Sequence, residues 1–299
     1  MYQFPMYYPK GFEPSRAHEL AYLCKQAYAL FEIDPPPARY ELERYKGERY
    51  EDVTPFWGGY KLTSPLELLI VVAAALKMHH KVNLHEMFGF VARRGDDVFV
   101  VFRGTDSVLD FLGDIHMSQV PIGQDHRPDS TRSRHWDAAR LEQGVWNMYS
   151  SMREQILSAI QALQKPGRRL FVTGHSLGAG LAIAAVPDLL KNTGYKTTEL
   201  YTFAGPRVAN REFALALLDH RVPCYRVVHT EDVVPTLPFP TPITMFDNFW
   251  KGRWYYSHVG TPVDFCRAWA PTDTPDVKAN HTIDLYLAAV DQTTGASLL

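Results

Sequence analysis

Segments with helical spacing of apolar residues alternate with short β-rich runs in the second half of the chain. The pattern predicts, in chain order, a helix, strand, helix, strand, helix and strand at residues 146–163, 169–173, 176–191, 200–203, 210–219 and 223–229. Strands that alternate with helices are typical of crossover connections. The alternation therefore predicts a mainly parallel, doubly wound sheet with helices on both faces.

The first half of the chain and its end supply further elements. Residues 15–31 have helical spacing behind a possible Ser15 cap. Residues 87–93 and 98–103 predict a hairpin, because the polar Arg94-Gly95-Asp96-Asp97 turn joins two β-rich runs. Further predicted elements are an irregular covering segment at 32–64, a surface loop at 124–140, an edge hairpin from 255–258 and 263–266, and a last helix from about 282.

Composition narrows the class of protein. Of 299 residues, 46% are hydrophobic, enough for a large core, and the net charge of −2 argues against a nucleic-acid binder. The longest apolar run, at 66–76, is well short of the roughly 20 residues that a membrane-spanning helix needs. The first ten residues lack the charged and apolar regions of a secretory signal, which leaves an intracellular protein or a secreted one that has been trimmed.

The strongest chemical signal is Gly174-His175-Ser176-Leu177-Gly178, which has the form G-x-S-x-G. A predicted strand precedes it and a predicted small-residue helix follows, as a nucleophile elbow requires. The turn pushes the serine hydroxyl out above the sheet, and the Leu177 N–H at the helix N-terminus is a natural donor to an oxyanion. The alternative is a glycine-rich packing turn with a capping serine. A dinucleotide loop fits worse, because the glycine spacing is not G-x-G-x-x-G.

Three further segments accompany this motif. They are Val98-Phe-Val-Val-Phe-Arg-Gly104-Thr105, Tyr201-Thr-Phe-Ala-Gly205-Pro206-Arg207-Val208 and Asp232-Val-Val-Pro235-Thr-Leu-Pro238. With them the chain resembles the class 3 lipases, the fungal-type lipases of the α/β-hydrolase superfamily, from about residue 85 to 290. The resemblance implies one α/β-hydrolase domain over 1–299, with 1–84 as an N-terminal helical and irregular covering segment.

A serine nucleophile needs a general base and a carboxylate to orient that base. Asp232 follows a predicted strand and matches the family's acid, whereas neighbouring Glu231 is expected to be solvated. Only His258 and His281 come after Asp232, as the order serine, acid, histidine demands. His281 matches the family's late D/N-H-x-x-x-x-Y segment and is preferred as the base. His258 is the alternative, and His175 is interpreted as a packing residue.

The resemblance also implies a second oxyanion donor and a lid. The family residue after the Arg-Gly pair donates to the oxyanion, and Thr105 stands there. Val108, Phe111, Leu112 and Ile115 have helical spacing. They stand where the family carries an amphipathic lid that opens at a lipid surface, and the alternative is a fixed helix packed over the sheet. Phe111 replaces the family's usual tryptophan.

These features predict a serine carboxylester hydrolase, foremost a lipase that cleaves acylglycerol-type esters through an acyl-enzyme. The expected partner is an ester or lipid substrate, at a lipid–water interface if the lid moves. No cofactor or metal is expected, because neither H-E-x-x-H nor an EF-hand loop is present and Cys24, Cys224 and Cys266 lack metal-ligand spacing. The alternatives are an esterase or phospholipase A1 that uses the same triad, or a catalytically silent lipid-binding protein on the same fold. The oligomeric state is left open.

Overall fold

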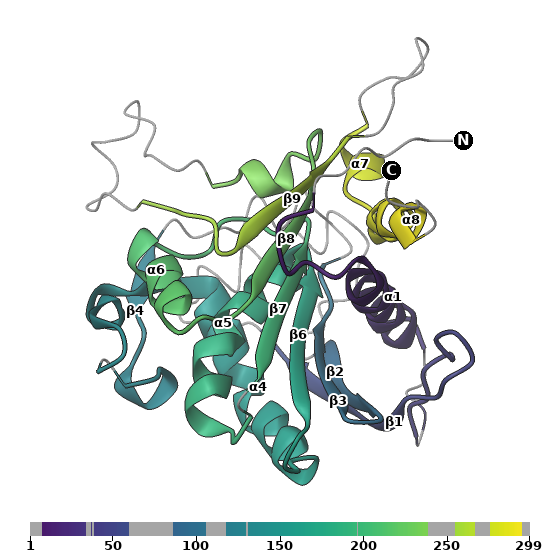
Figure 1. The fold of residues 1–299 in the computed structure, drawn as a ribbon, viewed down its shortest axis with the longest axis horizontal. Helices are drawn as coiled ribbons and strands as arrows, with labels where there is room; N and C mark the ends of the chain where they lie inside the picture. The colour runs from purple at the N-terminus through teal and green to yellow at the C-terminus, as the bar shows by residue number, and fades with distance from the viewer. Residues whose placement is uncertain are drawn as a thin grey trace, which may run out of the picture.

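A mainly parallel sheet forms the centre of the molecule (Figure 1). The computed structural model describes residues 8–33, 37, 39–59, 86–105, 118–129, 131–195, 197–238, 255–266 and 276–294. Within these residues seven strands pair in the order β1-β2-β3-β6-β7-β8-β9. Their bounds are β1 Glu51–Gly58, β2 Glu86–Arg94, β3 Asp97–Phe102, β6 Arg169–His175, β7 Thr198–Phe203, β8 Cys224–His229 and β9 Thr261–Phe265. The pairs from β3 to β9 are parallel, and β1 and β2 add an antiparallel edge.

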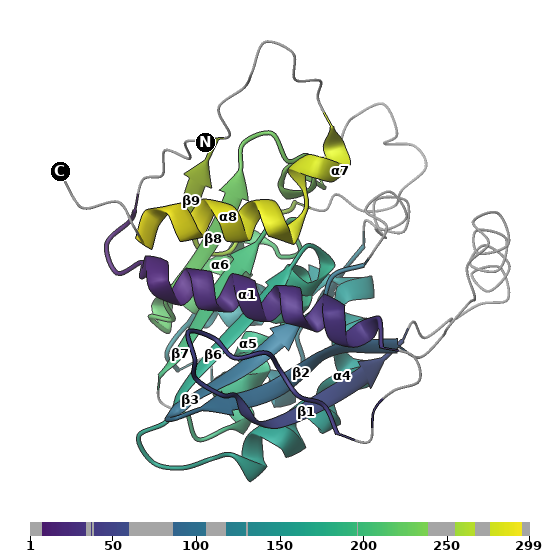
Figure 2. The ribbon, with the colours of Figure 1, turned by 90° about the vertical axis from the view of Figure 1, so that its right-hand side faces the viewer.

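Helices cover both faces of the sheet, as predicted. The connecting helices α4 (Gln143–Ala162), α5 (Leu177–Asn192) and α6 (Arg211–Asp219) pack on one face. Helices α1 (Pro14–Phe31) and α8 (Ile283–Thr294) lie side by side on the other (Figure 2). From β3 to β9 each strand of the main sheet lies beside the strand of this sheet that precedes it in the chain, so the chain crosses the sheet in one direction without turning back. The second face is covered by helices from the two ends of the described chain, rather than by the crossovers of a doubly wound sheet.

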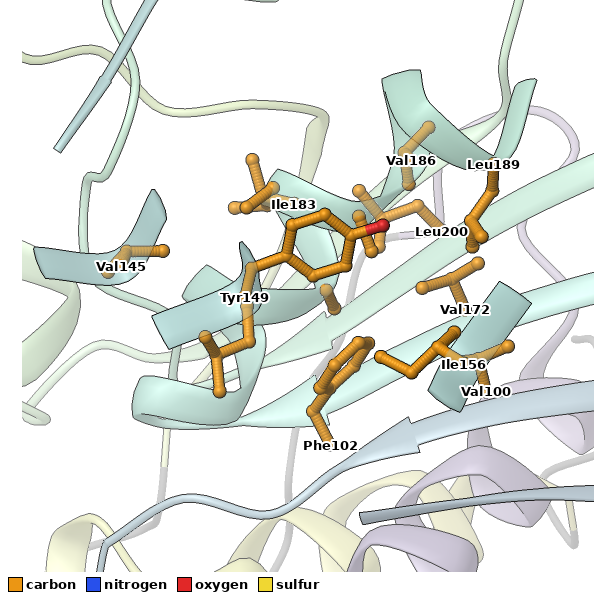
Figure 3. Close-up of a cluster of buried hydrophobic side chains, with 14 of the residues drawn as sticks. Val100, Phe102, Val145, Tyr149, Ile156, Val172, Ile183, Val186, Leu189 and Leu200 are labelled. Atoms are coloured by element: carbon orange, nitrogen blue, oxygen red, sulfur yellow. The ribbon is translucent and has the colours of Figure 1, made fainter. Parts of the chain in front are cut away.

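The strands divide their side chains between two cores. Val98, Val100 and Phe102 of β3 pack under α4 and α5, whereas Phe99 and Val101 pack under α1. Figure 3 shows the first core, where Tyr149 and Ile156 of α4 meet the strand residues. Strand β3 lies in the interior of the sheet, between β2 and β6, and all six of its residues are buried. The Arg-Gly-Thr segment that follows it therefore begins at the carboxyl edge of the sheet.

Short elements complete the described residues. Strands β4 (Gln119–Pro121) and β5 (Arg140–Glu142) pair with each other, and 3-10 helices η1 (Gln124–His126) and η2 (Arg134–Ala138) lie between them. The predicted loop at 124–140 therefore contains two short helices. Trp136 of η2 is buried against Phe213. Beyond β8 come the 3-10 helix η3 (Val234–Thr236) and the short helix α7 (Val277–Asn280).

Three local predictions are wrong. Ser15 does not cap α1, since Glu13 stands at the cap position without a side-chain hydrogen bond and Pro14 begins the helix. The predicted irregular segment at 32–64 contains β1, whose mostly exposed or half-buried residues lack a clear alternation. The predicted edge hairpin does not form, because β9 runs parallel to β8 and Ser257 bridges to Ala209 instead.

Two other predictions fall outside the described residues, namely the apolar run at 66–76 and the lid residues Val108, Phe111, Leu112 and Ile115. Among the helices that are described, none has the length and hydropathy to cross a membrane.

Candidate active site

The turn between β6 and α5 holds Ser176 in an uncommon backbone conformation. Its φ is 59° and its ψ is −126°, a region that residues with a side chain adopt rarely. The flanking glycines allow this turn to pack. A Cβ at Gly174 would come within 2.8 Å of Ala179 N, and one at Gly178 within 2.7 Å of the Arg103 carbonyl oxygen. The structure therefore has the strained strand-to-helix turn that the motif predicted.

Three side chains from distant parts of the chain meet at the carboxyl edge of the sheet. His281 Nε2 lies 2.8 Å from Ser176 Oγ, and His281 Nδ1 lies 2.8 Å from Asp232 Oδ2. Ser176, Asp232 and His281 are all buried. Because a carboxylate oxygen accepts, Nδ1 carries the proton toward Asp232, and Nε2 is left to accept from the serine hydroxyl. This is the arrangement of nucleophile, base and orienting acid.

Asp232 is itself held by two further donors. The Val234 N–H donates to Oδ1 at 3.0 Å, and the Tyr286 hydroxyl donates to Oδ2 at 2.7 Å. Burial, and then the neighbouring Asp232 carboxylate, raise the pKa of Tyr286 well above its usual value, so the hydroxyl stays protonated as a donor. Tyr286 closes the late sequence motif that carries His281, but the motif assigns it no role as a partner of Asp232.

The alternative base, His258, does not meet the serine. Its pKa is lowered to about 3, first by burial and then by Arg226 and Arg207, and its ring bonds to the backbone of Pro235. The Ser176 hydroxyl is instead bonded to His281. His175 contacts His281 and Tyr286 through its ring, as a packing residue would, but it also makes two hydrogen bonds that the sequence did not predict.

The expected oxyanion donors belong to two backbone segments next to Ser176. Helix α5 begins at Leu177, whose N–H belongs to the first turn and so has no partner within the helix. Thr105 is half-buried and follows Gly104, where a Cβ would come within 2.9 Å of Ser176 Cβ. The two backbone segments therefore approach each other beside the hydroxyl.

Arg103 anchors the segment that carries Thr105. The guanidinium is 1% exposed, lies 3.6 Å from the Phe31 ring centroid, and donates to Met87 O and to Glu86. This stacking and pairing fix the backbone immediately before Gly104. In the described ranges no three His, Cys, Asp or Glu side chains are grouped so as to hold a metal ion. Cys24 is buried and Cys224 is half-buried, and neither forms a disulfide.

Comparisons with known proteins find relatives among lipases and phospholipases A1. The family model described as lipase (class 3) matches residues 99–241. The secreted mono- and diacylglycerol lipase A of Penicillium cyclopium is 32% identical over 47% of this chain, and the match covers 43% of that lipase, so the chain spans less than half of its length. Phospholipase A1 EG1 of Oryza sativa subsp. indica is 27% identical over 92% of this chain and 68% of its own length.

Solved structures of lipases share the fold. Lipase II from Rhizopus niveus superposes with a TM-score of 0.58 at 19% identity, covering 93% of this chain and 96% of that chain. The triacylglyceride lipase of Rhizomucor miehei gives a TM-score of 0.56 at 20% identity, covering 88% and 83%. The chain therefore has the α/β-hydrolase fold.

Proposed function

Through residues 99–241 the chain belongs to the class 3 lipase family, and on that premise we propose that it is a serine carboxylester hydrolase that cleaves acylglycerol-type lipids. The observation that carries the proposal is the triad geometry, in which His281 lies 2.8 Å from both Ser176 Oγ and Asp232 Oδ2. Distances of this kind suit proton transfer between a nucleophile and its base.

In the proposed reaction Ser176 Oγ attacks the ester carbonyl carbon while its proton passes to His281 Nε2. The imidazolium that forms is stabilised by Asp232, and the oxyanion is stabilised by the backbone N–H groups of Leu177 and Thr105. The intermediate collapses when His281 gives the proton to the leaving alcohol, which yields the acyl-enzyme. Water then attacks the acyl carbon while His281 Nε2 takes its proton. The bond between that carbon and Ser176 Oγ breaks as His281 returns the proton to Oγ, which releases the fatty acid and restores the serine.

A phospholipase A1 is the second candidate, because a relative of that name aligns with most of this chain. It would use the same triad on the ester of a glycerophospholipid. Interfacial activation belongs to the proposal as well. It rests on the predicted lid at Val108, Phe111, Leu112 and Ile115, whose exposed apolar face would have to bind lipid better than water for the lid to open.

The first experiment asks whether the chain is a serine hydrolase at all. A fluorophosphonate probe should label the folded protein, and Ser176→Ala should abolish both labelling and ester hydrolysis while leaving the thermal unfolding transition in place. Folded protein that is not labelled and turns over no ester would favour a silent lipid-binding protein.

The second experiment separates the substrate classes. Turnover of short-chain soluble esters, emulsified triacylglycerols and phosphatidylcholine vesicles labelled in the sn-1 chain is compared at equal ester concentration. We expect the highest rate on the emulsified acylglycerol, with a jump above its solubility limit. A preference for the labelled phospholipid would support the second candidate, and equal rates below and above the solubility limit would remove the lid from the proposal.

A further inference from the structure

A chain of two hydrogen bonds connects helix α1 to the backbone of His281. The Tyr28 hydroxyl lies 2.9 Å from His175 Nδ1, and His175 Nε2 lies 2.8 Å from the backbone oxygen of His281. Tyr28 is near the end of α1, a part of the chain that the family match does not include. His175 is buried at the end of β6, immediately before Ser176.

The acceptor at one end determines the direction of both bonds. A backbone carbonyl can only accept, so His175 Nε2 carries the proton and donates to His281. Nδ1 is then the acceptor, and the Tyr28 hydroxyl donates to it. Burial, followed by the nearby His281, lowers the pKa of His175 well below its usual value, which is consistent with a neutral ring in this tautomer.

We propose that His175 and Tyr28 are positioning residues, which hold the backbone of His281 so that its imidazole stays aimed at Ser176. This inference rests on the proposed function. His175 is the immediate neighbour of Ser176 on a buried strand, so the bond ties the base to the same strand that carries the nucleophile.

The position of His281 in the fold explains why such a tie is needed. His281 follows the four-residue helix α7 and precedes α8, so its backbone lies in a connection rather than in a long regular element. Its side chain must nevertheless keep two 2.8 Å contacts at once. A displacement of about 1 Å in such a site can cost on the order of 100-fold in rate.

The tautomer also suits the charge that forms during the reaction. The rings of His175 and His281 are 4.9 Å apart between centroids. In the proposed mechanism His281 becomes an imidazolium, and a second cation at this distance would oppose it. The hydroxyl of Tyr28 occupies the one ring nitrogen of His175 through which that ring could take up a proton.

The test compares two substitutions of His175. His175→Gln keeps a donor for the His281 carbonyl and an acceptor for Tyr28, whereas His175→Leu keeps volume and removes both. We expect His175→Leu to lower kcat and the rate of fluorophosphonate labelling about 30- to 100-fold with KM unchanged. His175→Gln should restore most of that loss. A residue that only packs would give the opposite order, because Leu preserves packing better than Gln.

Two tyrosines of helix α1, Tyr28 and Tyr22, provide a test and a control for the hydrogen bond between Tyr28 and His175. Tyr28→Phe removes the hydroxyl and should lower kcat about 3- to 10-fold, the range expected for the loss of one hydrogen bond. Tyr22→Phe is the control, because its hydroxyl is on the same helix but bonds to Glu43. It should leave kcat unchanged. Thermal unfolding of every variant shows whether the protein is folded at the assay temperature.

The outcomes separate this inference from the function on which it rests. If the unsubstituted protein is neither labelled nor active, the proposed function fails. If that protein is active and folded His175→Leu keeps kcat within twofold, or if His175→Gln is as impaired as His175→Leu, the positioning role is overturned. A Tyr28→Phe variant that matches Tyr22→Phe would remove Tyr28 from the chain of bonds and leave His175 alone as the positioning residue.

Discussion

One oxygen of Asp232 accepts from two side chains at once. Oδ2 receives His281 Nδ1 at 2.8 Å and the Tyr286 hydroxyl at 2.7 Å, while Oδ1 receives a backbone N–H. A carboxylate bonded on both oxygens has little freedom to rotate, so the direction in which it presents Oδ2 to the imidazole is set by its neighbours. At the scale of the residue, the acid is therefore a three-donor site rather than an isolated carboxylate.

Removing one of these donors should lower activity without abolishing it. Tyr286→Phe deletes the hydroxyl and keeps the ring, so we expect kcat for a soluble ester to fall about 10-fold, the size expected for a hydrogen bond to a charged group. Asp232→Asn should cost far more, about 10⁴-fold, because the amide favours the wrong imidazole tautomer. Steady-state kinetics with both variants measures the two effects. Equal losses, or none for Tyr286→Phe, would contradict this ranking.

Sequence motifs located the three side chains that the structure brings together, and they missed the side chains that hold them. Ser176 and Asp232 each lie directly beyond a strand within a local pattern, so their positions were predictable. Tyr28 carries no such pattern, because its contact with His175 joins residues 147 positions apart. Such a partner depends on how α1 crosses the sheet, which no local spacing specifies.

At the scale of the element, α1 is attached to the sheet by a buried ion-pair cluster. Arg16 pairs with Glu19 and with Asp97 of β3, both at 2.6 Å, and its guanidinium lies 4.0 Å from the centroid of Phe171. Asp97 also pairs with Arg169, whose side chain is 46% exposed. The cluster lies at the start of β3 and β6, at the opposite end of these strands from the triad.

Removing Arg16, the buried arginine of this cluster, should destabilise the protein strongly. Arg16→Ala removes the most buried ion-pair partner of Glu19 and Asp97, which keep the more exposed Arg94 and Arg169, and we expect the free energy of unfolding to fall by about 3 kcal/mol. Arg169→Ala is the matched control, since a half-exposed arginine on the same Asp97 should contribute at most about 1 kcal/mol. Urea unfolding monitored by circular dichroism measures both. Equal losses would mean that the burial of Arg16 is not what matters.

Most elements followed from the hydrophobic pattern, and each failure has its own physical cause. The three helices and three strands predicted between 146 and 229 are present with small shifts of their ends. Strand β1 was missed because it contains Pro55 and exposes much of its length at the sheet edge. Strand β9 was recognised as β-rich but paired wrongly, because alternation marks a strand without giving its partner or direction.

At the scale of the whole molecule, histidines with lowered pKa values link folding to pH. His258 has a pKa of about 3 in the folded protein against an ordinary value of 6.5, and the pKa of His175 is lowered in the same direction. Below about pH 6.5 the unfolded chain binds protons that the folded chain does not. The free energy of unfolding should therefore fall as the pH is lowered from 6.5 toward 3.

Each such histidine contributes a slope of at most about 1.4 kcal/mol per pH unit. Urea unfolding at pH 7, 6 and 5 should show a smaller slope for His258→Gln than for the unsubstituted protein, because glutamine cannot take up the proton. Between pH 7 and 8 the two proteins should have parallel stabilities. Identical slopes from pH 6 to 5 would show that His258 is protonated in the folded state.

That residues 1–299 form a single domain stays a prediction.

The pairing of α1 with α8 bears on how the protein is made. Synthesis delivers Tyr28 first, Ser176 later, and His281 with Tyr286 last, yet all four lie together in the folded protein. A nascent chain that lacks residues 281–286 has no His281 imidazole beside Ser176, so the proposed hydrolysis requires that these residues have been synthesised and that α8 has docked beside α1.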